Sequence, residues 1–169
     1  LDNGAKIIND ISGGDLDKEM FKTIGDYKAP YIMMHMKGIP KNMQDNPNYE
    51  DVTVDIIKDF SRKIENAQSQ GINDIIIDPG FGFGKTLNHN YEILNNLELF
   101  KILNRPILVG ISRKSMIYKV LNNTPQRALT GTISLNTIAL IMGANLLRVH
   151  DVKEAKETIN LFNYLKENV

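Results

Sequence analysis

At 169 residues, the chain is long enough for one domain with a hydrophobic core and too short for two large domains. Its 42% of apolar residues is typical of a globular protein, and its 20 basic residues balance its 20 acidic ones, so the overall charge does not indicate binding to nucleic acid or to an anionic membrane. Cysteine is absent, which excludes disulfides and suits a reducing compartment, and no apolar run reaches the ~20 residues of a membrane helix, so we expect a cytoplasmic protein.

The hydrophobic pattern predicts five strands that alternate with helices. Strands are expected at residues 6–10, 31–36, 74–78, 106–112 and 145–149. Helices are expected at 17–27, from 52 to a stop at Gly71, after a cap at Asn88, in a short piece reaching 121, at 129–143, and at the end of the chain. Each of the longer helices has a periodic apolar face that we expect to be buried. In the helix from residue 52 this face consists of Val52, Ile56, Phe60, Ile64 and Ala67, after Asn88 it consists of Tyr91, Leu94 and Leu97, and in the last helix it consists of Ala155, Ile159, Phe162 and Leu165.

Strand starts lie roughly 25 to 43 residues apart, a spacing typical of parallel βα units. Each predicted strand carries polar residues at its C-terminal end, namely Asn9, His35, Asp78, Lys114, and Arg148 with His150. In a β/α barrel or an open α/β sheet, these ends meet at one face, where ligands bind. The pattern therefore predicts one shared site.

The stretch from Asp74 to Thr86 is the most informative part of the chain. Three isoleucines predict a strand buried on both faces, and Asp78 follows directly at its end. A buried carboxylate costs free energy unless a polar group meets it, so we expect a ligand with hydrogen-bond donors. Three spaced glycines would let the backbone approach that ligand, and Phe81 and Phe83 offer flat apolar walls. The glycine spacing fits neither a P-loop nor a dinucleotide fingerprint.

Each candidate residue also has a purely structural explanation. Asn9 could equally cap a turn, and Asp10, on the opposite face of its strand, is expected to be structural. His35 stands among methionines, so a core histidine with a satisfied ring is preferred to a ligand.

The basic residues leave the same choice open. Arg113 and Lys114 could form an exposed pair, although their place after a predicted strand favours a site. Arg148 and His150 alternate along one strand and point the same way, which permits a salt bridge but favours an anion site. The three histidines show no paired-ligand spacing, so no zinc site is expected.

Five motifs in this order resemble the dihydropteroate synthase family over essentially the whole chain: Ile-Ile-Asn-Asp, Met-His-Met, Asp-Pro-Gly-Phe-Gly-Phe-Gly-Lys, Ser-Arg-Lys-Ser and Arg-Val-His-Asp. The resemblance implies a TIM (β/α)8 barrel, usually a homodimer. It also implies an enzyme that joins 6-hydroxymethyl-7,8-dihydropterin diphosphate to p-aminobenzoate and releases diphosphate in folate synthesis. Sulfonamides mimic p-aminobenzoate in that family.

The resemblance implies substrate-binding residues at the mouth of the barrel: Asn9, Met36, Asp78, Phe83, Gly110, Lys114, Ser115, Arg148 and His150. Of these, Asn9, Asp78 and Lys114 would hydrogen-bond the pterin. Arg148 would stack on the pterin ring and, with His150, hold the diphosphate. The catalytic residues implied are Asp78, which could stabilise a cation-like pterin, and Lys114.

The walls of the implied pocket come from other parts of the chain. Met36 and Phe83 would line it, and Ser115 would help to place the carboxylate of p-aminobenzoate.

The resemblance also implies that this chain supplies about the last five of eight βα units, as one partial pterin-binding domain over residues 1–169. The chain begins without methionine, in what looks like a helix tail, which suggests a start partway through a larger protein. The family's Mg²⁺ ligand would lie in the missing first strand, so no metal ligand is expected here. The rival hypotheses are a pterin-binding methyltransferase domain and a non-catalytic fragment that keeps only the dimerisation surface.

Overall fold

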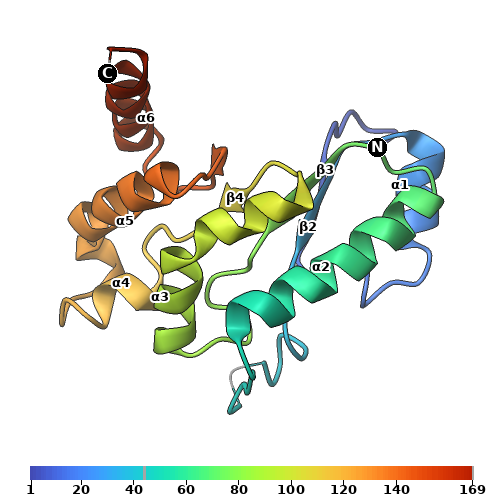
Figure 1. Ribbon diagram of the computed structural model, residues 1–169, viewed down its shortest axis with the longest axis horizontal. Coiled ribbons are helices and arrows are strands. Elements are labelled where there is room, and N and C mark those ends of the chain that lie inside the picture. The colour runs from blue at the N-terminus through green and yellow to red at the C-terminus, as the bar shows by residue number, and fades with distance from the viewer. Residues whose placement is uncertain (44, 169) are drawn as a thin grey trace.

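The computed structural model describes residues 1–43 and 45–168 and has an α/β fold in which strands alternate with helices (Figure 1). The strands are β1 (Ile8–Asp10), β2 (Tyr31–Met34), β3 (Ile75–Asp78), β4 (Leu108–Val109) and β5 (Leu146–Leu147). The helices are α1 (Met20–Tyr27), α2 (Val52–Ser69), α3 (Leu87–Asn95), α4 (Ser115–Tyr118), α5 (Leu129–Ile141) and α6 (Val152–Asn168), with 3₁₀ turns η1 (Leu97–Leu103) and η2 (Pro125–Arg127).

All strand pairs are parallel, as the spacing predicts. One sheet has the order β1-β2-β3, the other pairs β4 with β5, and a bridge between Ile77 and Ile107 connects the two. The C-terminal ends of the strands therefore lie along the same edge, where the candidate site is expected.

The last two strands are shorter than predicted because side chains replace their ladder bonds at both ends. Before β4, Ile107 N donates to Asn145 Oδ1 at 2.9 Å. After β4, His150 N donates to Ser112 Oγ at 3.2 Å. The predicted strands at 106–112 and 145–149 are thus reduced to two residues each, with the chains still side by side.

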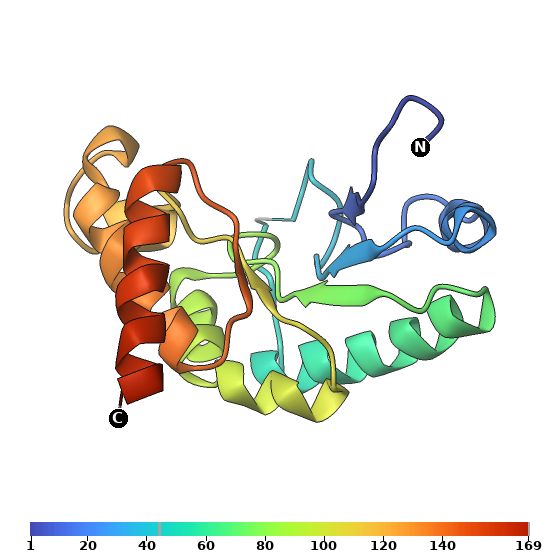
Figure 2. The same cartoon turned by 90° about the horizontal axis from the view of Figure 1, so that it is seen from above.

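The two faces of the β1-β2-β3 sheet differ in what covers them. Every second side chain of these strands points to the same face of the sheet. On one face, Tyr31, Met33 and Ile77 are fully buried in the hydrophobic core, together with Phe60 of α2 and Phe100 of η1. The helices form an arc on this side of the strands (Figure 2). The opposite face of the sheet, which we call the inner face, carries the remaining side chains. The pairing of β1 with β2 and of β2 with β3 puts Asn9, Ile32, Ile76 and Asp78 on this inner face.

Helix α2 confirms the predicted pattern closely. Val52, Ile56, Phe60, Ile64 and Ala67 are all buried, one on each successive turn. The helix begins where the Asp51 side chain accepts a hydrogen bond from Val54 N at 2.9 Å, and it ends just before the predicted glycine.

Helix α1 begins three residues later than predicted. Asp17 makes a turn in which its carboxylate accepts from Glu19 N at 2.9 Å and its carbonyl from Met20 N at 3.2 Å. This local competition delays the helix. Ile24 is buried in the core and Met20 and Phe21 pack against it, whereas Leu16 and Tyr27 are exposed.

Helix α3 is capped by Thr86, and the prediction of an Asn88 cap is wrong. Thr86 Oγ1 accepts from His89 N, and Thr86 N donates to His89 Nδ1, both at 3.2 Å, so the two residues form a capping box. The expected core residues Leu94 and Leu97 are buried, and Tyr91 is half-buried.

Helix α6 buries Ala155, while Ile159 and Phe162 are half-buried. The prediction that Leu165 faces the core is wrong, because that side chain is 57% exposed. Helix α6 packs against α5, and its later turns leave apolar side chains uncovered in the described part of the chain. Each helix in the described residues is too short or too polar to cross a membrane.

Candidate functional site

The end of β3 supplies the central acid of the candidate site. Asp78 lies on the inner face, is only 6% exposed, and accepts a hydrogen bond from Gly80 N at 2.8 Å. Burial raises the pKa of Asp78, and the Gly80 hydrogen bond and the charges of Lys114, Lys85 and Arg148 oppose that shift. A buried acceptor of this kind is suited to a ligand that presents N–H groups.

The glycine loop after β3 lies directly against the chain that follows β2. Gly80 has φ +73°, and a Cβ there would be 1.9 Å from His35 O. Gly84 has φ +63°, and a Cβ there would be 2.3 Å from Lys37 O. Only glycine allows both the left-handed backbone and this close approach, which brings the two segments into one rigid rim.

Lys114 reaches over this loop from the turn after β4. Its Nζ donates to Phe81 O at 2.6 Å and lies 4.9 Å from the centre of the Phe83 ring. Burial lowers the pKa of Lys114, while the charge of Asp78 raises it. Lys114, Phe83 and Asp78 therefore form one cluster, drawn from two segments more than 30 residues apart.

The end of β5 adds two basic residues to the same side. Arg148 N donates to Val109 O at 2.9 Å, and a Cβ on Gly110 would be 3.7 Å from Arg148 Cβ. His150 Nδ1 lies 3.0 Å from Ser112 Oγ. Arg148 also shifts the pKa of both Asp78 and Lys114, so its charge belongs to this cluster.

Arg113 and Lys114 do not form an exposed basic pair. The Arg113 guanidinium binds Asp151 through two hydrogen bonds, of 2.9 and 2.7 Å, and donates to the carbonyls of Pro125 and Gln126. The hydrogen bond with Asp151 raises the pKa of Arg113 and lowers that of Asp151. Arg113 thus connects the Lys114 turn to the end of β5, a structural role.

The other predicted residues lie around this cluster. Asn9 is exposed on β1, on the inner face, two strands away from Asp78. Met36 is buried beyond β2 and lines a cavity of about 580 Å³ that α2 shares. Ser115 is half-buried at the start of α4, next to Lys114.

Asp10 has the structural role predicted for it. Its carboxylate accepts hydrogen bonds from Ser12 N at 2.8 Å, Gly14 N at 2.7 Å and the Tyr31 hydroxyl at 2.7 Å. Tyr31 lies on the face of the sheet that the helices cover. Asp10 therefore fixes the loop after β1 on the side away from Asp78.

His35 is the buried and satisfied histidine that was predicted, and its partner is a residue that the sequence did not reveal. Lys85 is 3% exposed, and its Nζ lies 3.0 Å from His35 Nδ1. Burial and the charge of Lys85 lower the pKa of His35 to about 3. Burial lowers the pKa of Lys85 to about 7, against the opposing charge of Asp78. The one signal was the Gly-Lys step that ends the glycine loop.

Among residues 1–43 and 45–168, no group of three or more His, Cys, Asp or Glu side chains is arranged to hold a metal ion.

Comparisons of the sequence with known proteins identify a family that the chain matches. Residues 1–150 match the family described as pterin binding enzyme. The dihydropteroate synthase of Escherichia coli (strain K12) is 42% identical over 160 residues, which cover 94% of this chain and 56% of the relative. That of Clostridium beijerinckii is 41% identical over 157 residues, with 91% and 56% covered.

Solved structures agree with the sequence comparison. A Yersinia pestis dihydropteroate synthase in complex with a sulfonamide drug has a TM-score of 0.94 at 40% identity, covering 98% of this chain and 61% of that one. The Thermus thermophilus enzyme in complex with 6HMPPP has a TM-score of 0.94 at 32% identity, covering 98% and 66%. The chain spans little more than half the length of the curated relatives above.

Proposed function

Because this chain belongs to the family of pterin-binding enzymes, we propose that it forms part of a dihydropteroate synthase. The reaction would join 6-hydroxymethyl-7,8-dihydropterin diphosphate to p-aminobenzoate and release diphosphate. One observation carries the proposal: the buried acid Asp78 stands with Lys114 and Arg148 at the C-terminal ends of parallel strands.

The pterin would occupy the inner face above Asp78. The carboxylate suits the amino and ring N–H groups of a pterin, and the donors of Lys114 and Asn9 suit its carbonyl and ring nitrogens. Phe83 offers a flat apolar wall, and Gly110 leaves room beside Arg148. A neutral heterocycle with donors on one edge fits this set of groups.

The diphosphate and the second substrate would lie toward β5. Arg148 and His150 supply positive charge where the leaving group gains negative charge. Ser115, beside Lys114 at the start of α4, would help to place the carboxylate of p-aminobenzoate. Met36 would contribute to the far wall of the pocket.

The proposed reaction breaks the bond to the diphosphate and forms a bond to the aryl amine. The C–O bond to diphosphate breaks, its electron pair leaves with the diphosphate, and the pterin becomes cation-like. Asp78, when ionised, stabilises that positive charge. The aryl amine then forms the C–N bond with its lone pair and gives up a proton to water.

The proposal also includes the fold of the whole enzyme. The strands would be the last five units of a (β/α)8 barrel, with residues 1–169 as one pterin-binding domain. β1 and β5 are edge strands here, and further strands would close the barrel. The Mg²⁺ ligand would lie in such a strand, outside this chain. The assembly would be a homodimer of the cytoplasm, the compartment expected from a cysteine-free sequence, and sulfonamides would compete with p-aminobenzoate.

The test is diphosphate release from pterin diphosphate, measured with and without p-aminobenzoate, on the complete polypeptide and on residues 1–169. Release that depends on p-aminobenzoate supports the synthase. Methyl transfer to a pterin without diphosphate release would instead support the methyltransferase hypothesis. Activity in the complete polypeptide alone would identify residues 1–169 as an incomplete site, and inactivity of both would overturn the proposal.

A further inference from the structure

We propose that Lys85 is a positioning residue for the pterin pocket, holding the glycine loop of residues 80–84 against the end of β2. The inference deepens the proposed function and rests on it for the identity of the ligand. Lys85 lies outside the set of substrate-binding residues, and its role would be exerted through the loop.

Three hydrogen bonds connect Lys85 to two separate segments. Its Nζ lies 3.0 Å from His35 Nδ1 and donates to His35 O at 3.2 Å and to Phe83 O at 2.9 Å. When Lys85 is protonated and His35 carries its proton on Nε2, the three N–H donors of the ammonium match these three partners in number. Each bond is directional, so the set fixes where the loop lies relative to β2.

The burial of this charge argues against a packing role alone. Lys85 is 3% exposed, and taking an ammonium out of water is costly unless hydrogen bonds compensate. An apolar side chain of similar length would fill the same space without that cost. The hydrogen bonds of this buried amino group are therefore expected to contribute something that packing does not.

The position of the glycine loop determines where several groups of the proposed pterin pocket lie. The carbonyl of Phe81 accepts from Lys114 Nζ at 2.6 Å, and the Phe83 ring lies under the same ammonium. A shift of residues 80–84 would therefore move the apolar wall and Lys114 together. The Gly80 amide that binds Asp78 belongs to the same loop. Lys85 thus sets the geometry of the groups that would meet the pterin.

The first experiment is the binding of pterin diphosphate, without p-aminobenzoate, to the complete polypeptide carrying Lys85→Met. Calorimetry should show a Kd raised on the order of tenfold, because a small misplacement of binding groups is expensive. A loss of folded protein would lower the number of sites and leave Kd unchanged, so the two effects are separable. An unchanged Kd overturns the inference.

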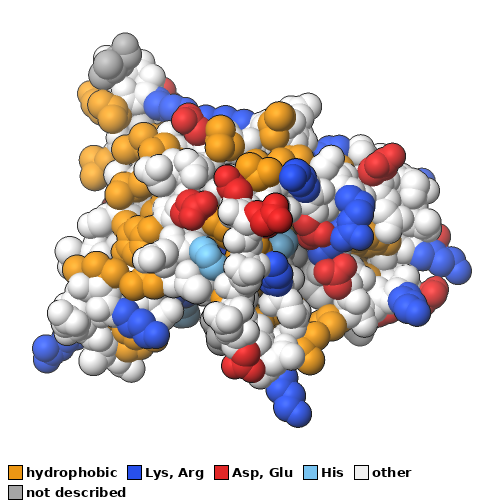
Figure 3. Space-filling model, turned by 60° about the horizontal axis from the view of Figure 1, so that its bottom comes forward, with side chains coloured by type: hydrophobic (Ala, Val, Ile, Leu, Met, Phe, Trp, Pro, Cys, Tyr) orange, Lys and Arg blue, Asp and Glu red, His pale blue; other side chains and the backbone are white. Residues whose placement is uncertain are grey.

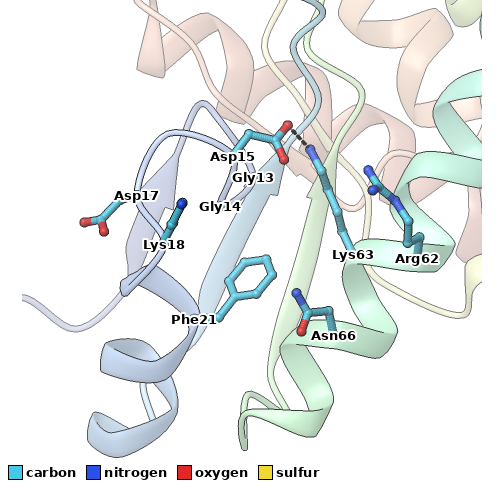
Figure 4. A pocket seen from close by; sticks show the side chains of 9 residues that line it. All are labelled: Gly13, Gly14, Asp15, Asp17, Lys18, Phe21, Arg62, Lys63 and Asn66. Carbon is cyan, nitrogen blue, oxygen red and sulfur yellow. Dashed lines mark hydrogen bonds and ion pairs between the residues drawn. The ribbon is translucent and has the colours of Figure 1, made fainter.

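Lys63→Met is the matched control, since Lys63 is the other lysine of the described chain with a side chain about as buried, at 5% exposure. Its Nζ binds Asp15 at 2.6 Å and Asp59 at 3.0 Å, beside a cavity of about 290 Å³ between the loop after β1 and α2 (Figure 4). It makes no hydrogen bond to residues 80–84 in the described contacts. Kd for the pterin should stay within twofold of the unsubstituted value.

A second readout does not need the ligand. In the unliganded protein, hydrogen exchange of the amides of residues 80–84 should be on the order of tenfold faster in Lys85→Met than in Lys63→Met. If the unsubstituted protein binds no pterin diphosphate but this exchange difference is found, the proposed function fails and the loop-holding role stands. If exchange is equal in the two variants, the loop-holding role is wrong whatever the protein binds.

A pair of His35 variants covers the case in which Lys85→Met does not fold. His35→Leu removes the Nδ1 acceptor and should raise the exchange rate and Kd. His35→Asn keeps an acceptor at a similar position and should restore both toward the unsubstituted values. Equal behaviour of the two variants would contradict the role assigned to the Lys85–His35 hydrogen bond.

Discussion

Two aspartates at strand ends show how surroundings assign different roles to the same residue type. Burial alone would raise the pKa of Asp10, but hydrogen bonds from Ser12, Tyr31 and Gly14 together lower it. Asp78 receives one backbone hydrogen bond, from Gly80, and for this carboxyl the effect of burial prevails. The first acid is satisfied by its own protein, and in the proposed function the pterin would supply further hydrogen bonds to the second.

Asp10→Ala should lower the free energy of unfolding by about 3 kcal/mol, because it leaves several buried donors without their acceptor. The lowered pKa of Asp10 means that its stabilisation is present above its ordinary value of 3.8 and is lost as the pH falls below it. Urea unfolding at several pH values should therefore show the variant and the original protein converging in acid. The exposed Asp26→Ala is the control, and an equal loss there would contradict the assignment.

Asp78→Asn should weaken pterin binding roughly tenfold to hundredfold, since one hydrogen bond to a charged group contributes about 1.5–3 kcal/mol. The raised pKa of Asp78 means that the folded state keeps its proton to higher pH than the unfolded state does. Stability is therefore lost as the pH rises through the folded pKa, and the neutral amide avoids this loss. Thermal unfolding of the unliganded variant at neutral pH should give a higher Tm. Near-normal turnover would exclude Asp78 from the chemistry.

At the scale of elements, the candidate site depends on short connections whose geometry is set by a few local bonds. The glycine loop passes directly into α3, which begins at a capping box between Thr86 and His89. Asn90, buried in the first turn of that helix, accepts from Gly82 N at 2.7 Å and donates to Thr86 O at 2.6 Å. The start of α3 and the loop therefore form one unit.

Thr86→Ala should destabilise the protein by about 1 kcal/mol, the usual cost of losing an N-cap side chain. Asn88→Ala is the matched control, because Asn88 is exposed one residue inside the helix and does not cap it. Denaturant unfolding should show a clear shift of the midpoint for the first variant and almost none for the second. A larger shift of the midpoint for Asn88→Ala than for Thr86→Ala would instead support the Asn88 cap that the sequence predicts.

At the scale of the whole molecule, apolar side chains gather at the end formed by α5 and α6 (Figure 3). Ile141 is 60% exposed, and Leu161 is 74% exposed. A monomer in water rarely leaves such a group uncovered. The homodimer in the proposed function would cover this end.

Leu161→Lys in the complete polypeptide should then raise the dissociation constant of the dimer by about tenfold or more, since a central apolar contact would be replaced by a buried charge. Leu16→Lys is the control, because Leu16 is 57% exposed in the segment before α1, and α1 lies at the opposite end of the molecule from α6 (Figure 1). Analytical ultracentrifugation measures both. A dimer unaffected by Leu161→Lys would show that this end is covered by something other than a second copy.

The sequence predicted most of the elements, and the strand ends that carry the candidate site, because both depend on local patterns. The periodic apolar residues of α2 mark its buried face, and the three isoleucines before Asp78 mark a largely buried strand. The predictions that failed depend on alternatives within a few residues. Thr86 and Asn88 are both good N-caps, and only the path of the chain into the helix decides between them.

By itself, the sequence determined the alternation of strands and helices, the acid at the end of the central strand and the family resemblance. Only the tertiary structure decided the roles of the lysines and arginines. Lys85 points to His35, Lys114 to Phe81, and Arg113 to Asp151, and each pair joins residues more than 30 positions apart. A charged side chain looks the same in the sequence whether it faces water, a ligand or a distant partner, because the free energy that separates these states comes from burial and from contacts between segments.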